Sequence, residues 1–203
     1  MDITIIGTGN MARGIATRAV AGGHDVALIG TDPEKAKQLA AEVGAKAGEG
    51  TIEGGVVVLA IWYGSVDQVL QQYGDQLDGK VVVDITNAVD PNTFEPLDIG
   101  AGSIAQEIAG KVSGAKVVKA FNTTFAGTLV EGEVAGSPLD GFIASDDEDA
   151  KRTVSELAES SGLRPIDAGP LRRARELEAL GYLHMTLQDG LGTGYGSTVK
   201  VLG

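Results

Sequence analysis

Short apolar runs alternate with amphipathic segments along most of the chain. The runs are continuous, and the segments between them repeat apolar residues at helical spacing. This pattern predicts strands at residues 3–6, 25–29, 46–47, 56–61, 80–85, 116–121, 141–145 and 164–168. It predicts helices at residues 10–21, 33–44, 66–77, 103–111, 149–160 and 171–187. A long loop with Asn87, Pro91 and Pro96 interrupts this alternation.

Alternation of fully apolar strands with helices is typical of a parallel sheet that is covered on both faces. We therefore predict an α/β fold with a doubly wound, mostly parallel sheet and a small C-terminal strand–helix extension. The length of 203 residues suits one sizeable core and is short for two, so residues 1–203 are predicted to form one domain. Residues 189–203 form a Gly-rich tail.

The composition narrows the choice of ligands. Glycine makes up 30 of the 203 residues, and the glycines punctuate the apolar runs, which suits tight turns between strands and helices. A net charge of −12 disfavours nucleic acid and anionic membrane surfaces as partners. Cysteine is absent and the two histidines are far apart in the sequence, so neither disulfides nor a metal site is predicted.

The N-terminal residues carry no basic region with a signal-type apolar core behind it. The longest apolar run, residues 56–63, is far shorter than a membrane span. The sequence therefore predicts a cytoplasmic protein without a membrane partner.

The sequence GTGNMA at residues 7–12 has the form G-x-G-x-x-A. It directly follows the first predicted strand and opens the first helix, which is the context of a dinucleotide-binding turn. In that turn Gly7 makes the bend, Gly9 lets the backbone approach a diphosphate, and Ala12 allows close helix–strand packing. The helix start adds unpaired N–H groups and a positive dipole end. We assign cofactor binding to the whole turn: Gly7, Thr8, Gly9, Asn10, Met11 and Ala12.

The end of the second predicted strand should distinguish NADP from NAD. An acid at that place binds the ribose in NAD-dependent proteins, but here the place falls on Gly30. A glycine there removes the carboxylate that would repel a 2′-phosphate and leaves room for the phosphate. Asp32 has a local role as the N-cap of a helix that continues with Pro33. Thr31 and Lys35 are candidates for a 2′-phosphate, although an exposed lysine in a first helical turn is often only solvated. These residues favour NADP and leave NAD as an alternative.

Four stretches together resemble the family of NADPH-dependent reductases of the deazaflavin coenzyme F420. They are GTGNMA, VVVDITNAV (residues 81–89), VVKAFNT (residues 117–123) and DAGPLRRARELEAL (residues 167–180). The chain also resembles the oxidoreductase domain of six-transmembrane metalloreductases. The resemblance implies that Thr31 and Lys35 contact the 2′-phosphate. Asp32 departs from the family, which has an arginine at that position.

The nicotinamide of such a cofactor should lie at the carboxyl ends of the strands, near the point where the strand order reverses between the two halves of the sheet. That places Ile61, Trp62, Asn87, Ala88 and Asn122 around it, with Tyr63 and Phe121 nearby. Trp62 is suited to wall a ring pocket, but an interface or core tryptophan is an equal alternative. Asn87 and Asn122 are suited to hold a carboxamide or to satisfy loop backbone groups.

No Ser/Tyr/Lys or His/Asp constellation is apparent, and we assign no catalytic residue. Hydride transfer between two flat rings needs stacking and a fixed distance more than an acid or base. The predicted function is hydride transfer between NADP(H) and a flavin-like acceptor, most specifically coenzyme F420. A reductase of free flavin or another small acceptor, and a dinucleotide-binding sensor without turnover, are the alternatives.

Three further features complete the expectations. Lys119, within a predicted strand, needs a partner or a ligand. The cluster Arg172, Arg173 and Arg175 is either an anion site or an exposed helix face, and His184 is expected to be structural. The glycines of the tail suit close approach to a ligand or an arm on a partner subunit, and a homodimer is the expected assembly.

Overall fold

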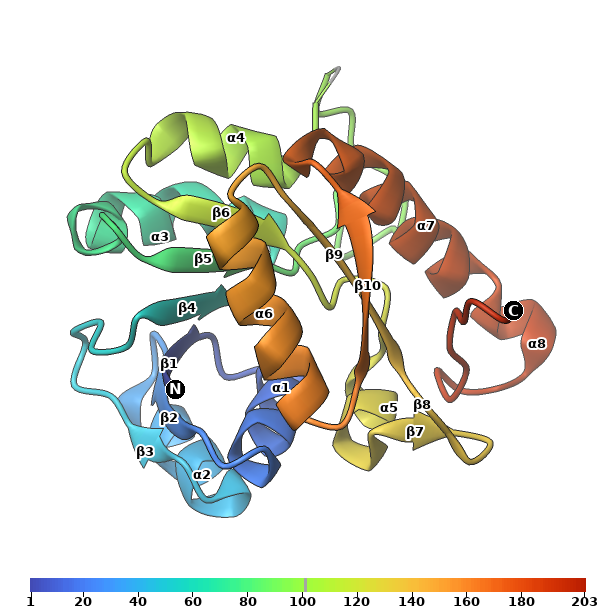
Figure 1. Cartoon of the computed structure of the whole chain (residues 1–203), viewed down its shortest axis with the longest axis horizontal. Helices are drawn as coiled ribbons and strands as arrows, with labels where there is room; N and C mark the ends of the chain where they lie inside the picture. The colour runs from blue at the N-terminus through green and yellow to red at the C-terminus, as the bar shows by residue number, and fades with distance from the viewer. Residues whose placement is uncertain (101) are drawn as a thin grey trace.

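The computed structural model describes residues 1–100 and 102–203, and its first half follows the predicted alternation closely. Helix α1 connects β1 to β2, α2 connects β2 to β3, α3 connects β4 to β5, and α4 connects β5 to β6 (Figure 1). The bounds are β1 Asp2–Ile6, α1 Asn10–Ala21, β2 Asp25–Ile29, α2 Pro33–Val43, β3 Lys46–Ala47, β4 Val56–Leu59, α3 Val66–Tyr73, β5 Val81–Asp84, α4 Ile104–Lys111 and β6 Lys116–Lys119.

The second half contains elements that periodicity did not predict. The elements of this half, predicted and unpredicted together, are α5 Ala126–Glu131, β7 Glu133–Val134, β8 Ser137–Pro138, β9 Asp140–Ser145, α6 Glu148–Ser160, β10 Arg164–Gly169, α7 Ala174–Thr186 and α8 Gln188–Leu191. Helix α5 and the β7–β8 hairpin were missed, and the helix predicted at residues 171–187 begins with a separate 3-10 turn, Leu171–Arg173. Helix α8 extends over the first residues of the Gly-rich tail, residues 189–191.

Eight strands form one sheet in the order β10-β9-β6-β5-β4-β1-β2-β3. The pairs from β3 to β6 are parallel, which confirms the doubly wound α/β prediction. Strand β9 runs antiparallel to β6, and β10 runs parallel to β9. The last strand is thus the edge strand of the main sheet, and the strand–helix extension continues the sheet in the direction away from β1.

Alternate strand residues enter two different cores, one on each face of the sheet. In β4, Val56 and Val58 pack in the core under α1, α2 and α6, whereas Val57 and Leu59 pack in the core under α3 and α4. This is the period of two that side chains follow along a strand. Helices covering both faces explain why the strands read as continuous apolar runs.

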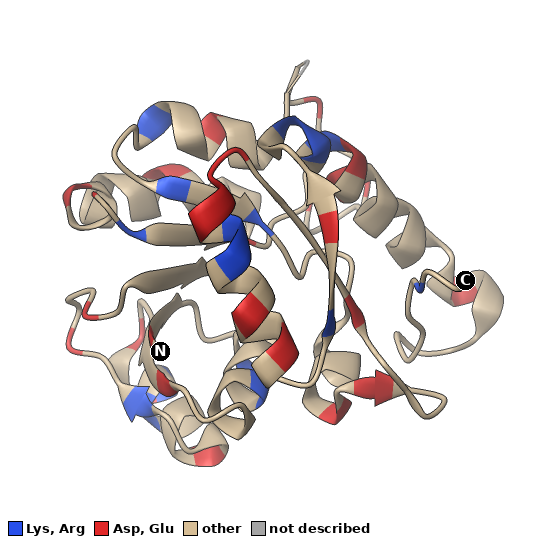
Figure 2. Ribbon diagram, in the orientation of Figure 1, with Lys and Arg blue, Asp and Glu red and all other residues tan. Residues whose placement is uncertain are grey.

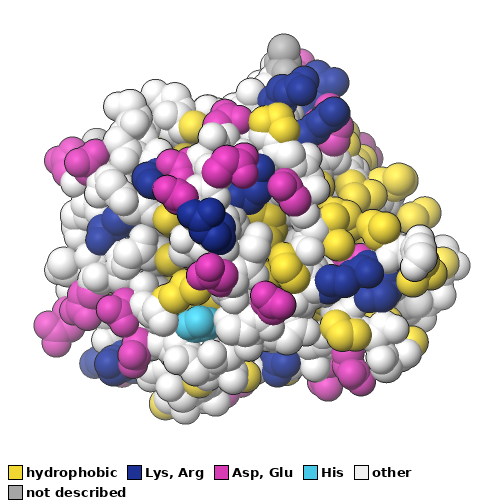
Figure 3. All heavy atoms as spheres, viewed as in Figure 1, with side chains coloured by type: hydrophobic (Ala, Val, Ile, Leu, Met, Phe, Trp, Pro, Cys, Tyr) yellow, Lys and Arg dark blue, Asp and Glu magenta, His cyan; other side chains and the backbone are white. Residues whose placement is uncertain are grey.

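Charged side chains are spread over much of the surface, but the last two turns of α7 carry none (Figure 2). Leu183, Leu187 and Leu191 are about half exposed along α7 and α8. Figure 3 shows apolar side chains gathered at the right-hand side, over α7 and the chain end. Among the described residues, no helix combines the length and the hydropathy that crossing a bilayer requires.

Candidate functional site

The turns that follow β1, β2, β4, β5 and β6 open onto one cleft of about 910 Å³. These turns meet at one edge of the sheet because parallel strands end on the same side. Thirty of the described residues line the cleft: Ile6, Gly7, Thr8, Gly9, Asn10, Met11, Ile29, Gly30, Thr31, Ala60, Ile61, Trp62, Tyr63, Ser65, Gln68, Val69, Gln72, Tyr73, Ile85, Thr86, Asn87, Val89, Phe94, Asn122, Thr124, Phe125, Ala126, Gly127, Met185 and Tyr195.

The lining differs from the rest of the chain in its charged and its aromatic residues. No Asp, Glu, Lys or Arg belongs to the lining described here, although these residues make up 22% of the sequence. Six of the nine aromatic residues of the chain line the cleft. Planar, largely uncharged surfaces of this kind suit ring systems that stack, and placed backbone dipoles must hold any phosphate.

Gly7 makes the turn between β1 and α1. Its φ is +133°, a region that side chains rarely adopt, and a Cβ at this position would lie 2.1 Å from the carbonyl oxygen of Ala60. The backbone N–H of Gly7 donates to the carbonyl of Ile29 at 2.8 Å. Only glycine therefore lets β1 turn between the ends of β2 and β4.

Gly9 has no such steric reason to be glycine. It is the N-cap of α1, its backbone is extended, and a Cβ would meet no atom of the described residues within 4 Å. No side chain caps the helix, the first turn contains no acid, and the first intrahelical bond runs from the N–H of Arg13 to Gly9. Gly9 lines the cleft, and the first turn of α1 that follows it has no side-chain cap. This arrangement fits an anion held at the helix start.

The segment after β2 contains the predicted cap. Asp32 is the N-cap of α2 and accepts from the N–H groups of Glu34 and Lys35 at 3.0 and 3.3 Å. Thr8 and Thr31 line the cleft, whereas Lys35 is exposed in the first turn of α2 and lies outside the lining. A Cβ on Gly30 would lie 2.5 Å from Cγ2 of Thr8, so the space that the glycine leaves is occupied by the threonine methyl group.

Two asparagines predicted to border a nicotinamide bind each other. The Asn122 side-chain N–H₂ donates to Oδ1 of Asn87 at 2.9 Å and to the carbonyl of Leu177 at 2.8 Å. The Asn87 side chain donates to the Asn122 carbonyl at 3.0 Å. The pair faces Gly181 of α7, where a Cβ would come within 2.9 Å of Oδ1 of Asn87. The pair therefore joins the ends of β5 and β6 to α7.

One polar atom of this pair remains without a partner. Oδ1 of Asn122 is buried and accepts no hydrogen bond from the residues that the structure describes, although Asn122 lines the cleft. A buried amide oxygen without a donor is costly, and a ligand amide or a water would relieve that cost. Trp62 is 55% exposed, which removes the core alternative and leaves it at the cleft wall or an interface.

Phe121 was expected beside the nicotinamide, and that expectation is wrong. Its backbone has φ +60°, and its ring is buried in the core formed with α1 and α6. The turn is fixed by Thr124, whose hydroxyl donates to the Phe121 carbonyl at 2.7 Å. A strained, non-glycine residue held in this way at a strand end aims the following Asn122 toward the cleft.

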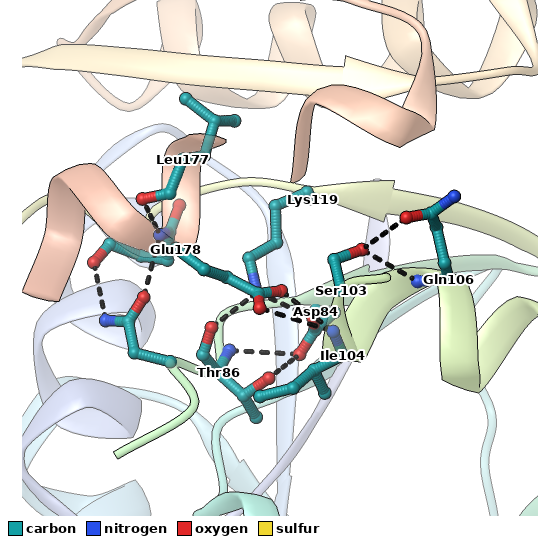
Figure 4. A network of polar contacts seen from close by, with 10 residues as sticks. Asp84, Thr86, Ser103, Ile104, Gln106, Lys119, Leu177 and Glu178 are labelled. Carbon is teal, nitrogen blue, oxygen red and sulfur yellow. Dashed lines mark hydrogen bonds and ion pairs between the residues drawn. The ribbon is translucent and has the colours of Figure 1, made fainter. Parts of the chain in front are cut away.

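A buried ion network lies behind the cleft (Figure 4). Lys119 is fully buried, and its ammonium contacts Asp84 and Glu178 at 2.8 Å each. It also donates to the carbonyl of Thr86. Asp84 accepts in turn from the Thr86 N–H at 2.9 Å and from its hydroxyl at 2.7 Å. Lys119 therefore has protein partners, and the network holds the segment that leads into Asn87.

The network contains two carboxylates for one ammonium. Glu178 also accepts from the N–H of Ile104, at the first turn of α4, at 3.1 Å. The positive dipole end at the start of α4 stabilises negative charge, and it therefore compensates part of the excess negative charge of the two carboxylates. Burial nevertheless raises the pKa of Glu178 above its ordinary value, while the Lys119 ammonium acts in the opposite direction.

The far end of the cleft is aromatic. The Phe125 ring stacks on the His184 ring with centroids 4.3 Å apart, and Tyr195 contacts Phe125 edge-on at 5.0 Å. His184 is buried, contacts the Thr123 carbonyl through Nδ1 at 3.2 Å, and pairs with Ser197 through Nε2 at 2.8 Å. Burial lowers the pKa of His184, which keeps the ring neutral. These contacts agree with the expected structural role.

The Gly-rich tail is folded onto the body of the chain. The side chain of Gln188 accepts from Thr193 at 2.6 Å and from Ser197 at 3.0 Å. Further along, the Val201 N–H donates to Asp140, at the start of β9, at 2.8 Å. These bonds place Tyr195 on the cleft.

Ten of the thirteen predicted binding residues line this one cleft: Gly7, Thr8, Gly9, Asn10, Met11, Thr31, Ile61, Trp62, Asn87 and Asn122. Ala12 is buried in the core beneath the turn, and Ala88 packs against the other core. Sequence reasoning missed Phe94, Phe125 and Tyr195, because loop residues without periodicity give no sign of where they fold. No cluster that could hold a metal ion occurs within residues 1–100 and 102–203.

Comparisons with known proteins agree with this geometry. Residues 2–88 match the family described as NADP oxidoreductase coenzyme F420-dependent. The chain is 32% identical over 202 residues to the F420-dependent NADP reductase of Methanothermobacter thermautotrophicus, covering 89% of this chain and 86% of that protein. The chain belongs to the family of F420-dependent NADP reductases. It is therefore a member of an oxidoreductase family.

A metalloreductase and two solved structures are also similar to the chain. The chain is 32% identical over 185 residues to the metalloreductase STEAP3 of Rattus norvegicus, of which it spans only 36%. The crystal structure of a putative F420-dependent NADP reductase from Arthrobacter sp. FB24 superposes with a TM-score of 0.88 at 27% identity, covering 99% of both chains. A pyrroline-5-carboxylate reductase from Coxiella burnetii shares the fold alone, at 18% identity and a TM-score of 0.64.

Proposed function

We propose that the protein transfers hydride between NADP(H) and a flavin-like acceptor, most specifically the deazaflavin coenzyme F420. One observation carries the proposal: an uncharged cleft begins at an uncapped helix start and ends among aromatic rings. The first part suits a diphosphate, and the second suits two stacked planar rings. Membership of the family supports the same pairing of substrates.

The dinucleotide would be held mainly by backbone. The N–H groups of Asn10 and Met11, in the uncapped first turn of α1, would bind the diphosphate. The hydroxyls of Thr8 and Thr31 are the lining groups available to a 2′-phosphate. Lys35, on the adjacent turn of α2, would add its charge from outside the lining.

The redox end would be arranged for ring stacking. NADPH supplies the hydride when bound, and the acceptor ring takes up that hydride together with one proton from solvent. Ile61 and Trp62 would border the nicotinamide, and the unpaired Oδ1 of Asn122 would accept from its carboxamide. Asn87 would keep Asn122 in place through the bond between the two side chains. No charged side chain in the described lining competes as an acid or base.

Stopped-flow mixing of the protein with NADPH and oxidised F420, FMN or FAD tests the reaction. Bleaching of F420 is the expected result. Bleaching of FMN or FAD but not F420 would make the protein a reductase of free flavin. Tight NADPH binding without bleaching of any acceptor would contradict the enzyme and favour a sensor.

The preference for NADP has a separate test. We expect NADPH to bind more tightly than NADH, and Lys35→Ala to weaken only NADPH. Lys37→Ala is the matched control, because Lys37 lies on the same helix and pairs with Glu34 at 2.8 Å in solvent. Equal weakening of both dinucleotides by Lys35→Ala would show that Lys35 does not read the 2′-phosphate.

We further propose one domain, a cytoplasmic location and a homodimer. The one continuous sheet supports a single domain. The half-exposed residues Leu183, Leu187 and Leu191 support association with a second copy. Sedimentation equilibrium measures the assembly, and a monomer at micromolar concentration would contradict the dimer.

A further inference from the structure

We infer that the buried network of Asp84, Lys119 and Glu178 selects between the two redox states of the bound dinucleotide, because it holds one net negative charge behind the nicotinamide end of the cleft. The oxidised ring is positively charged and the reduced ring is neutral, so a fixed negative charge favours NADP⁺ over NADPH. The inference rests on the proposed function. It assigns Glu178, the second carboxylate of the network, as the residue that determines this preference.

The contacts of the network suit two ionised carboxylates. Asp84 accepts from Lys119 and from the N–H and the hydroxyl of Thr86. Glu178 accepts from Lys119 and from the N–H of Ile104. All of these partners donate, whereas a protonated acid would need an acceptor for its own hydrogen. With one ammonium between two carboxylates, the network therefore carries one net negative charge.

The charge is buried and lies close to the cleft. Lys119 and Asp84 are fully buried, and Glu178 is 6% exposed. Thr86 connects the network to the cleft, because its hydroxyl lies 2.7 Å from Oδ1 of Asp84 and Thr86 itself belongs to the lining. Water and salt screen a buried charge only weakly. Its field therefore reaches a ring bound beside Thr86.

Helix α7 brings the second carboxylate to the nicotinamide end of the cleft. Glu178 follows Leu177, whose carbonyl accepts from the side chain of Asn122 at 2.8 Å. The buried Oδ1 of Asn122, which accepts no bond from the described residues, is the atom proposed to bind the carboxamide. The described lining contains no Asp, Glu, Lys or Arg, so the lining itself holds no charge that would offset the network.

The preference has a consequence for the direction of hydride transfer. NADP⁺ and NADPH carry the same phosphates, so the ratio of their dissociation constants isolates the charge of the ring. A tenfold contribution to that ratio corresponds to about 1.4 kcal/mol. It lowers the midpoint potential of the bound couple by about 30 mV. The network therefore favours departure of the hydride from the dinucleotide.

Calorimetric titrations with NADP⁺ and with NADPH, at mildly alkaline pH, test the inference without turnover. Glu178→Gln removes one negative charge and keeps the shape of the side chain. Its oxygen can keep both bonds, because Oε1 of Glu178 accepts from Lys119 and from Ile104. We expect the ratio of the dissociation constant of NADP⁺ to that of NADPH to rise about tenfold. An unchanged ratio would overturn the inference, even if both affinities fall together.

Glu176→Gln is the matched control. Glu176 lies on the same helix with its side chain 51% exposed, so this variant changes the net charge equally but at the surface. The ratio should change by less than about twofold, and high salt should abolish that change. The effect of Glu178→Gln should persist at high salt. Equal effects of the two variants would assign the preference to the overall charge of −12 and refute the inference.

Further variants separate charge from packing. Lys119→Met combined with Glu178→Gln leaves one negative charge, on Asp84, which keeps its two bonds from Thr86. This double variant should return the ratio to within about threefold of the parent. Adding Asp84→Asn removes the last charge and should raise the ratio again. A ratio that does not follow the charge through this series would overturn the inference, also if Glu178→Gln alone does not fold.

The titrations can fail independently of the proposed function. Bleaching of an acceptor by a protein whose ratio is insensitive to Glu178→Gln would keep the proposed function and overturn the inference. The expected ratios without bleaching of any acceptor would support the inference and contradict the enzyme.

Discussion

Replacing Lys119 by methionine should be the most destabilising change in the polar interior. Methionine keeps most of the volume but removes the one cation between two buried carboxylates. Each contact is 2.8 Å long, and attraction at that distance is about 6 kcal/mol in an effective dielectric of about 20. Most of this attraction offsets the cost of desolvating the charges, so the net loss on removing one partner is about 3–5 kcal/mol.

Urea unfolding, followed by circular dichroism, measures the loss. With an m-value of about 2 kcal/mol per molar, the midpoint should fall by about 2 M. Lys116→Met is the matched control: Lys116 begins the same strand, but its pair with Asp147 is 3.3 Å long and its side chain is 41% exposed. An exposed pair contributes below about 1 kcal/mol.

Two outcomes would refute this reasoning. One is a cost for Lys119→Met no larger than that for Lys116→Met. The other is no recovery when Asp84→Asn and Glu178→Gln are added, because the loss is assigned to uncompensated charge and not to packing. If Lys119→Met alone does not accumulate, the triple variant still provides the test.

The remaining predictions concern the turn, the cap and the acid of the network. Gly7→Ala should unfold or misfold the turn, because its Cβ would lie 2.1 Å from a backbone oxygen, whereas Gly9→Ala should melt like the parent and bind NADPH more weakly. Thermal melts and NADPH titrations distinguish the two variants. Equal melting temperatures for both would contradict the steric argument. Asp32→Ala should cost about 1 kcal/mol of stability by removing an N-cap, as urea unfolding would show, and an unchanged midpoint would argue against capping. Glu178 has a raised pKa in the folded state, so its contribution should favour folding below its ordinary value of 4.5 and be lost as pH rises through the raised pKa. Glu178→Gln should flatten that part of the stability–pH curve, and an unaltered slope would contradict the assignment.

Local features were predictable from the sequence because neighbouring residues determine them. The turn at Gly7 and Gly9 needs only the strand before it and the helix after it. The cap by Asp32 involves residues two and three positions later. Continuous apolar strands were sufficient for the doubly wound sheet, because burial on both faces leaves no alternation.

Features that depend on distant residues were not predictable. The partners of Lys119 are 35 and 59 positions away along the chain. Gly30 was predicted to leave room for a phosphate, but the methyl group of Thr8 fills that room. Short α5 was missed because six residues give too little periodicity. Phe94 and Tyr195 reach the cleft because their backbone is left-handed, and aromatic residues give no sign of that conformation in a sequence.

The antiparallel joint between β6 and β9 has a consequence for how the chain opens. Strand β9, helix α6 and strand β10 form one local unit, and β9 pairs with β6 through only Val118 with Ser145 and Lys119 with Ala144. Units with local contacts and few bonds to their neighbours open before the whole protein does. Native-state hydrogen exchange should therefore show amides of β9 and β10 exchanging as one group, at a lower opening free energy than those of β1 and β4. The amides of β1, which leads into the cleft, would then remain protected from exchange while β9 and β10, at the far edge of the sheet, detach.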